Sequence, residues 1–383
     1  MKEKLLRFGS YVLVAVLATV ATLTMVHLEV GLKPTKLDQL EALIAEQFIG
    51  EADPAVLEDA AADAMVKATG DRWSYYMSAE EYASQREQSE NAYVGVGITI
   101  QAAEDGSGFL ILEVAAGGPA EEAGIQVQDL LIGVEETDIR GMDLTDVGSL
   151  VKGEENTYVT LNLLRKGETI SLPVQRRKVQ TPVATCEMLP DNIGLITIEN
   201  FDDRCAEESI AGIEALLDTG AQKLIFDVRH NPGGYAHELV DLLDYLLPEG
   251  DLFRTVRYDG KEHVDTSDAD CLEIPMAVLV NESSYSAAEF FAAALQEYGA
   301  GIVVGEKTVG KGYFQVTHRL SDGSAVALSI GKYYTPNGVS LAETGVTPDY
   351  IVPVDDETEA GIYYGTLARS EDPQLQAAVK QLK

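Results

Sequence analysis

Basic residues are scarce in this chain of 383 residues, in which 28 Lys and Arg stand against 63 Asp and Glu, for a net charge of −35. Binding to nucleic acid needs a basic surface that faces the phosphates. Broad docking on anionic lipid head groups needs one as well. The composition therefore argues against both kinds of partner and predicts an acidic, well-solvated surface.

Cysteine is almost as rare. Cys186, Cys205 and Cys271 show no CxxC or Cys/His spacing, which argues against a zinc site. We expect no metal and no cofactor. An odd number of cysteines leaves at least one thiol free, and the sequence leaves open whether the other two form a disulfide.

Charged side chains are missing altogether between Phe8 and Leu28, a run of 21 residues. As a helix, such a run spans about 30 Å, the thickness of a bilayer core. Three basic residues precede it and predict a cytoplasmic N-terminus. We expect a single-pass anchor within residues 1–30, with the rest of the chain outside the cytoplasmic membrane. A cleaved signal peptide, which would release a secreted form, is the alternative, although the run contains only a poor A-x-A site.

Hydrophobic periodicity divides the remaining sequence into four parts. Helical spacing comes first, then period-two alternation, and then alternating strands and helices that predict a mixed α/β core with a mostly parallel sheet. One strand is expected over residues 94–100 and one closing helix over residues 361–382. The predicted parts are a helical segment 31–90, a β-rich module 91–178, an α/β core 179–356 and a helical tail 357–383.

The β-rich module begins with a glycine-containing stretch that suits anion binding. Its residues are Tyr93, Val94, Gly95, Val96 and Gly97. Glycines let consecutive backbone N–H groups converge on a carboxylate, and the next strand can pair with a peptide. With GPAEEAG and DLLI further on, the module resembles a PDZ domain, and this resemblance implies capture of apolar C-termini. A generic small β-fold, whose glycines serve only turns, is the alternative.

A serine and a lysine in the α/β core form the strongest catalytic signal. Ser286 opens an apolar helix, and Lys311 follows 25 residues later in GEKTVGKGYFQ. A serine can act as a nucleophile when a neutral lysine takes its proton, and burial lowers the proton affinity of a lysine. Ser283 and Ser284 fit ordinary helix caps. A lysine exposed in a glycine-rich turn is the alternative interpretation of Lys311.

Three further features accompany this pair. In NPGG, Gly233 and Gly234 stand between a strand and a helix, where free N–H groups can face an oxyanion, although a tight turn also needs glycine. Glu289 lies three residues after Ser286 and either orients the site or completes a capping box. Gln315 lies four residues after Lys311, on the same face if both belong to one strand.

Two other interpretations of these segments are less favoured. Gly305 to Lys311 has the spacing of a phosphate loop, but Gly312 replaces the hydroxyl residue that would hold Mg²⁺ and no helix follows, so we reject it. His230 suggests a Ser/His hydrolase as an alternative, but the sequence shows no acidic residue that would orient this histidine.

Together with the PDZ-like module, these motifs resemble the C-terminal processing peptidases, serine peptidase family S41. The resemblance runs from about Leu37 to Leu382 and includes GDRWSYYM, NPGG, GEKTVGKG, LSIGKYYTPNG and GVTPD. It implies a ClpP/crotonase-like α/β core with an inserted PDZ module, and protein or peptide substrates. The residues to which it assigns roles are Ser286 as nucleophile, Lys311 as base, Gln315 as assisting amide, and Gly233, Gly234, Glu289 and Thr308 as supporting residues.

One departure from the family pattern concerns specificity. Tyr285 stands where the family usually has an alanine, which narrows the expected S1 region and puts the cleavage preference in doubt. A catalytically inactive, PDZ-containing scaffold is the alternative function, and the intact Ser–Lys spacing counts against it. Homodimerisation through the terminal helices is left open.

Overall fold

The computed structural model describes residue 16, residues 18–19 and residues 34–383. Its internal contacts divide the chain into two units, residues 1–77 and residues 78–383, which are described separately. The anchor predicted over Phe8–Leu28 lies almost entirely outside the described residues. None of the helices in the described ranges is both long enough and apolar enough to cross a membrane.

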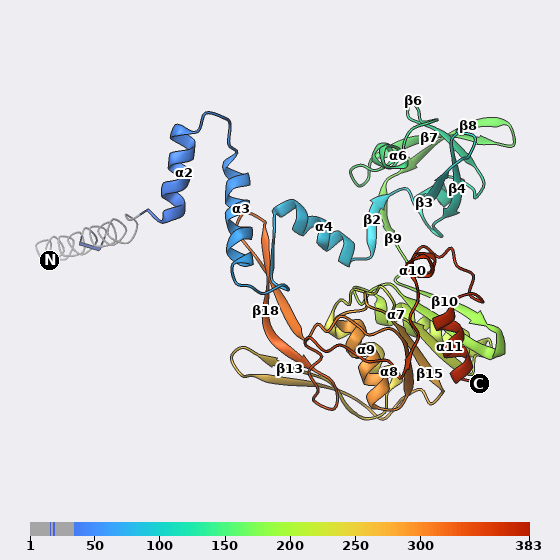
Figure 1. The fold of residues 1–383 in the computed structure, drawn as a ribbon. Helices are drawn as coiled ribbons and strands as arrows, with labels where there is room; N and C mark the ends of the chain where they lie inside the picture. The colour runs from blue at the N-terminus through green and yellow to red at the C-terminus, as the bar shows by residue number, and fades with distance from the viewer. Residues whose placement is uncertain (1–15, 17, 20–33) are drawn as a thin grey trace, which may run out of the picture. The chain divides into compact units, whose positions relative to one another are not determined.

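From residue 34 on, the first unit forms α2 (Lys36–Gln47), α3 (Pro54–Lys67) and β1 (Tyr75–Met77). Thr35 caps α2 in a reciprocal capping box with Asp38, which satisfies two N–H groups at the helix start. Asp53 caps α3, where proline occupies the first turn. The helical segment predicted from sequence is thus present as separate helices, shown in blue in Figure 1.

The second unit begins with α4 (Ala79–Ser89) and a small antiparallel module. A two-stranded ribbon, β2 (Ala92–Gly95) with β9 (Arg177–Gln180), stands at the module's two ends. The module's sheet has the order β3-β4-β5-β7-β8, with β6 paired to β5. Its elements are β3 (Ile98–Ala102), β4 (Phe109–Val114), α5 (Pro119–Glu122), β5 (Leu130–Val134), β6 (Thr137–Asp138), α6 (Leu144–Val151), β7 (Tyr158–Arg165) and β8 (Glu168–Gln175).

The single strand predicted over residues 94–100 is wrong, because the backbone turns in the middle of it. β2 ends at Gly95 and β3 begins at Ile98. Gly97 has a φ of 76°, which glycine adopts at little cost and which ends a strand. The turn divides Tyr93–Gly97 between the end of β2 and a two-residue loop, Val96 and Gly97, that leads into β3.

The α/β core contains a six-stranded sheet in the order β10-β11-β12-β15-β16-β19. Only β10 runs antiparallel; the other strands are parallel to their neighbours, as predicted. The strands are β10 (Ala184–Leu189), β11 (Ile193–Ile198), β12 (Lys223–Asp227), β15 (Met276–Val280), β16 (Gly301–Gly305) and β19 (Tyr350–Ile351), and the helices between them are α7 (Cys205–Asp218), α8 (Ala236–Leu246) and α9 (Ala287–Glu297).

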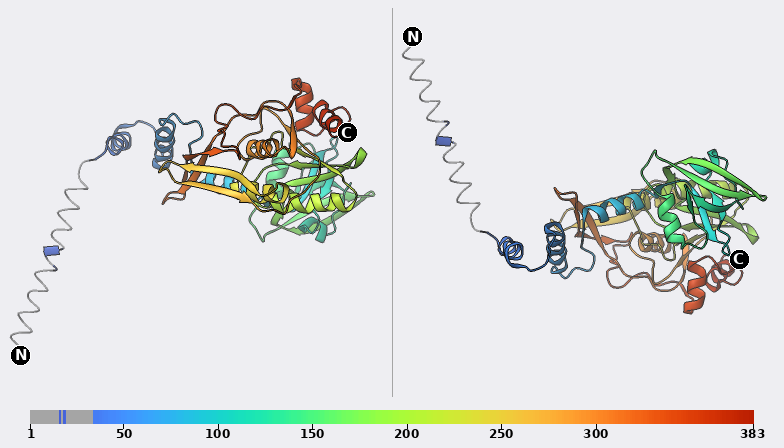
Figure 2. Two further views of the ribbon diagram at one scale, coloured as in Figure 1. Left: turned by 90° about the horizontal axis from the view of Figure 1, so that it is seen from below. Right: turned by 90° about the horizontal axis from the view of Figure 1, so that it is seen from above.

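Both faces of this sheet are buried. On one face, Ile196, Phe226 and Val278 pack in a cluster with residues of α7, α8 and α9. The alternate residues of the same strands form a second cluster with Leu375 and Ala378 near the C-terminus. Because successive strand residues point to opposite faces, one sheet supports two layers of helix. The orange helix α9 and the red C-terminal helices can be followed in Figures 1 and 2.

A second, antiparallel sheet lies beside the core. Its hairpins are β13 (Gly250–Arg257) with β14 (Glu262–Ser267) and β17 (Tyr313–Arg319) with β18 (Ala325–Tyr334), and β13 pairs with β18. The β13–β14 hairpin was not predicted. Its strands are rich in charged residues, so they lack the apolar alternation that marks a strand in a sequence.

The closing helix predicted over residues 361–382 is two helices, α10 (Asp356–Tyr363) and α11 (Pro373–Gln381). Pro373 occupies the first turn of α11, where its missing N–H is not needed, and Asp372 caps that turn. The last strand of the parallel sheet, β19, is only two residues long. All three cysteines are free thiols.

Candidate active site

Ser286 occupies a strained backbone position at the start of the buried helix α9. It follows β15 after a short turn, and 7% of its surface is exposed. Its φ of 60° and ψ of −124° belong to a region that non-glycine residues seldom occupy and that costs of the order of 1–3 kcal/mol. A serine in such a sharp strand-to-helix turn is typical of a hydrolase nucleophile. The conformation therefore favours Ser286 over Ser284, whose hydroxyl donates to the carbonyl of Val228.

The NPGG loop packs directly on Ser286. A Cβ added at Gly233 would lie 2.7 Å from the Cβ of Ser286, and one added at Gly234 would lie 2.3 Å from the carbonyl carbon of Phe201. Both glycines have positive φ, 88° and 155°. The loop requires glycine at both positions because it is held closely between Ser286 and Phe201.

The N–H groups of Gly233 and Ser286, which the sequence suggested as oxyanion donors, make internal hydrogen bonds. Gly233 donates to the side-chain oxygen of Asn231 (2.8 Å), and Ser286 donates to Glu289 Oε2 (2.9 Å). The neighbouring N–H groups of Gly234 and Ala287 have no acceptor within the described ranges. Unbonded donors therefore remain on both sides of Ser286.

Glu289 is fully buried and joins the serine loop to the lysine loop. Its Oε2 accepts from the N–H groups of Ser286 and Lys311, each at 2.9 Å. Its Oε1 accepts from the N–H of Gly310 at 2.7 Å and from the hydroxyl of Thr308. Burial raises the pKa of Glu289, and these four hydrogen bonds oppose that rise. The carboxylate thus accepts the N–H of the residue that starts α9, as a capping box requires, and also contacts the lysine loop.

Lys311 lies before β17, and its ammonium group is 5.8 Å from the centre of the Tyr285 ring. That distance is within the range of a cation–π interaction. Thr308, in the same loop, also accepts a hydrogen bond from the N–H of Val346 at 2.8 Å. The backbone of the lysine loop is therefore fixed both to Glu289 and to the segment that precedes β19.

Gln315 does not share a strand with Lys311, so the face-sharing argument is wrong. Lys311 precedes the first residue of β17, and the pairing register shifts between Phe314 and Gln315. The Gln315 amide donates to Ser329 Oγ (2.9 Å) and to the carbonyl of Tyr313 (3.3 Å). In this structure its bond to Ser329 connects β17 to β18.

His230 has the acidic neighbour that the sequence did not reveal. Its Nε2 lies 3.2 Å from Glu359 Oε1 on α10 and 3.0 Å from the side-chain nitrogen of Asn281. Burial lowers the pKa of His230, and the charge of Glu359 opposes that shift. Asn281 is fully buried and was missed as a site residue. Its only sequence signal is a polar residue directly after the apolar strand β15.

An apolar groove lies between β3 and α6 in the small module, with a volume of about 300 Å³. Its lining includes Ile98, Ile100, Leu144 and Val151, and the Tyr93–Gly97 stretch reaches its edge. The carbonyl groups of Val96 and Gly97 accept hydrogen bonds within the module, whereas their N–H groups have no acceptor in the described part of the chain. These are the features expected of a site for an extended apolar peptide with a terminal carboxylate.

Comparison with known proteins places the chain in a family. The model of peptidase family S41 matches residues 192–352, and a PDZ-domain model matches residues 110–165. The carboxy-terminal processing protease CtpA of Bacillus subtilis (strain 168) is 32% identical over 316 residues, which cover 82% of this chain and 67% of that protein. The chain belongs to peptidase family S41.

A second relative and one solved structure agree. The "Probable CtpA-like serine protease" of Staphylococcus aureus (strain COL) is 30% identical over 355 residues, which cover 90% of this chain and 71% of that protein. The structure of a "Putative S41 protease" from Bacteroides fragilis NCTC 9343 matches with a TM-score of 0.52 at 18% identity, over 91% of this chain and 97% of its own. The latter shows the fold alone. The predicted family, the PDZ module and the serine-type hydrolase class are confirmed.

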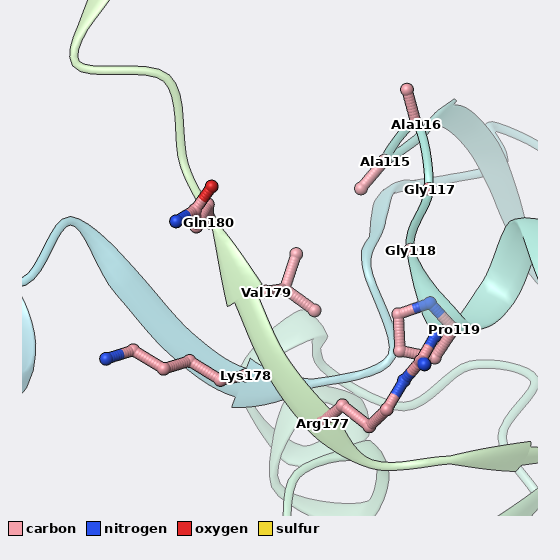
Figure 3. A pocket seen from close by; sticks show the side chains of 9 residues that line it. All are labelled: Ala115, Ala116, Gly117, Gly118, Pro119, Arg177, Lys178, Val179 and Gln180. Carbon is pink, nitrogen blue, oxygen red and sulfur yellow. The ribbon is translucent and has the colours of Figure 1, made fainter. Parts of the chain in front are cut away.

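A second pocket in the PDZ module, with a volume of about 360 Å³, lies between β9 and the turn before α5. Figure 3 shows the Arg177 side chain reaching toward Pro119, whereas the Lys178 side chain extends from the opposite side of β9. Arg177 pairs with Glu122 at 2.8 Å, and Lys178 pairs with Glu90. Because both cations have acidic partners, this pocket is a weaker binding candidate than the groove.

One group among the described residues of the peptidase core has metal-ligating side chains close together, namely Asp203, His237 and Glu238. Both carboxylate oxygens of Glu238 already accept N–H groups at the start of α7, from Arg204 (3.1 Å) and Ala206 (2.7 Å). His237 is largely exposed. These contacts give Glu238 a structural role as a helix cap.

Proposed function

We propose that this S41 peptidase is a serine endopeptidase with Ser286 as nucleophile and Lys311 as general base. The single observation that carries the assignment is the shared carboxylate oxygen of Glu289, which accepts the N–H groups of both residues. The strained backbone of Ser286 supports it, because such conformations persist mainly where function requires them.

The proposed reaction follows the usual course of acyl transfer. The Ser286 hydroxyl attacks the scissile carbonyl carbon while its proton passes to the neutral amine of Lys311. Collapse of the tetrahedral intermediate breaks the C–N bond, and the lysine ammonium returns the proton to the leaving amine. A water molecule, deprotonated by the same lysine, then attacks the acyl ester and regenerates Ser286.

Backbone N–H groups near Gly233 and Ser286 would stabilise the oxyanion in this mechanism. The unbonded donors of Gly234 and Ala287 are ready for that role, whereas Gly233 and Ser286 would first have to leave Asn231 and Glu289. Gln315 would assist Lys311 after giving up its bond to Ser329. Each donor is then a separate target for substitution.

We further propose that the PDZ groove binds the apolar C-terminus of a protein substrate. The unbonded N–H groups of Val96 and Gly97 would receive the terminal carboxylate, and the apolar lining would receive the last side chains. The name of the Bacillus subtilis relative, a carboxy-terminal processing protease, supports a substrate that is recognised near its C-terminus.

The proposal includes a single-pass anchor with the peptidase outside the cytoplasmic membrane, based on the uncharged run near the N-terminus. Digestion of intact cells by an added protease should remove the peptidase if this orientation is correct. Self-association through the terminal helices stays part of the hypothesis, because α2 exposes Leu37, Leu40 and Leu43.

The direct test uses the full-length chain in mild detergent, with casein and a peptide that ends in apolar residues. Ser286→Ala and Lys311→Ala should each abolish cleavage. Ser283→Ala and Lys307→Ala, exposed neighbours in the same two loops, should retain it. Cleavage that persists in both Ser286→Ala and Lys311→Ala would overturn the dyad. Inactivity of the unmodified chain, even with the PDZ module deleted, would favour the binding scaffold.

A further inference from the structure

The C-terminal segment, beyond the matched residues 192–352, contacts the two loops that carry the active site. Arg229, directly before His230, is 1% exposed and pairs with Asp227 at its own strand end. Its guanidinium also reaches Asp372 Oδ2 at 2.8 Å and Gln374 Oε1 at 3.0 Å. α11 is thereby joined to the start of the NPGG loop through buried charges.

A second connection runs from α10 through Asn281. The side-chain oxygen of Asn281 accepts the N–H of His230 at 2.9 Å and the N–H of Ser283 at 3.1 Å. Since both partners are donors, the amide orientation is fixed, and its nitrogen must face the other way. That nitrogen donates to Glu359 Oε1 at 2.7 Å. One buried amide thus holds the glycine loop, the serine loop and α10 together.

His230 depends on the contacts that Asn281 and α10 make with it. His230 has a φ of 60°, a strained value for a non-glycine residue, and so needs support from its neighbours. The Asn281 nitrogen, as a donor, faces Nε2 at 3.0 Å, which suits the neutral imidazole with Nε2 as acceptor. Tyr363 of α10 packs edge-on against the same ring, with centroids 5.0 Å apart.

We propose that Glu359 on α10 is a positioning residue of the active site, acting through Asn281 on the loops that carry Gly233 and Ser286. This role requires no contact between Glu359 and the substrate. The inference rests on the proposed function for its kinetic test, but the contact itself can be tested without activity. Glu359 holds the amide through Oε1 alone, because its Oε2 is buried with no partner in the described ranges. Removal of the side chain should therefore take away the acceptor that joins the Asn281 nitrogen to α10.

The kinetic test compares three variants of the full chain. Glu359→Ala should lower kcat by about tenfold to a hundredfold, because small displacements of catalytic loops have effects of this size, with KM nearly unchanged. Glu359→Gln keeps an oxygen that accepts from Asn281 and should restore most of kcat. Glu357→Ala, an exposed glutamate on the same helix, is the control. A kcat of Glu359→Ala equal to that of Glu357→Ala, or no rescue by Gln, would overturn the proposal.

A measurement independent of catalysis is the NMR titration of the His230 ring. The ring is faced by Glu359 and Tyr363 from α10, by Asn281, and by Arg229 and Asp227 from the end of β12. Glu359→Gln removes a charge that favours the imidazolium, so the titration should move to lower pH, whereas Glu357→Gln should leave it unchanged.

An unshifted His230 titration in Glu359→Gln would refute the contact itself. This result is distinct from failure of the dyad, in which Ser286→Ala would remain active whatever the Glu359 variants do. If Glu359→Ala does not fold, the isosteric Glu359→Gln still gives the titration and decides the outcome.

Discussion

The buried side chains of Glu289 and Asn281 behind Ser286 are bonded to the surrounding loops, whereas two N–H groups at the PDZ groove have no acceptor in the described part of the chain. Glu289 accepts four hydrogen bonds and Asn281 joins three segments. At the groove, the N–H groups of Val96 and Gly97 are unbonded beside an apolar lining. Catalysis needs fixed geometry, while recognition needs unsatisfied groups that a ligand completes. The two regions differ in the way these tasks require.

Replacement of Glu289 should have the largest effect on stability and activity, because it removes the hydrogen bonds that join the serine loop to the lysine loop. All four partners of the carboxylate are donors, and Glu289→Gln would replace one accepting oxygen with an NH₂ group that faces two of them. We expect a loss of about 2–4 kcal/mol in unfolding free energy and a fall in kcat of about a hundredfold or more. Urea denaturation and steady-state kinetics measure the two effects.

The matched control is Glu297, at the other end of α9. Its two oxygens accept from the Thr335 hydroxyl and the Asn337 N–H, each at 2.7 Å, with no link to Ser286. Glu297→Gln should lower stability by only about 1 kcal/mol and leave kcat near that of the unmodified chain. If the two variants lose kcat equally, the special role of Glu289 is disproved.

The role of the PDZ groove can be tested by a substitution at Gly148 of α6. This residue lines the groove, and a Cβ added there meets no atom within 4 Å. Gly148→Phe should fill the groove without strain. For a peptide with an apolar C-terminus, KM should rise by about tenfold to a hundredfold, the worth of one buried apolar side chain.

Ser149→Phe, on an exposed part of the same helix, should not change KM. A short peptide with an amidated C-terminus should be cleaved equally by all versions. Equal inhibition of both peptides by Gly148→Phe would mean that the groove affects the catalytic site itself and does not select C-termini.

The sequence predicted the local features of both regions and missed their long-range contacts. Ser286, Lys311 and the paired glycines of NPGG were predicted because strands, turns and glycine requirements are local properties. Asn281 and Glu359 are 78 residues apart, and no periodicity reports such a pairing. The prediction that Gln315 and Lys311 share one face of a strand failed for the same reason. The register shift beside Gln315 depends on the partner strand β18, which lies elsewhere in the sequence.

Asp202 should give the smallest effect, because it is a half-buried carboxyl group whose side chain has no hydrogen-bond donor among the described residues. Burial, and then the charges of Asp203 and Glu238, raise its pKa from 3.8 to about 6. Below pH 3.8 the carboxyl is protonated in both the folded and the unfolded states and costs nothing. As the pH rises through 6, the folded state loses stability relative to that limit. Asp202→Asn cannot ionise, so it should be more stable than the unmodified chain by about 1–2 kcal/mol at pH 7.5, after allowance for partial exposure.

The stability gain of Asp202→Asn should shrink as the pH falls and vanish near pH 4, which urea denaturation at several pH values would show. Asp218→Asn, at the exposed end of α7, should give no such pH-dependent gain. A variant that is less stable than the unmodified chain at pH 7.5 would show that the carboxylate is stabilised by a partner. In that case the satisfied polar network of the core would extend beyond Glu289 and Asn281 to the start of α7.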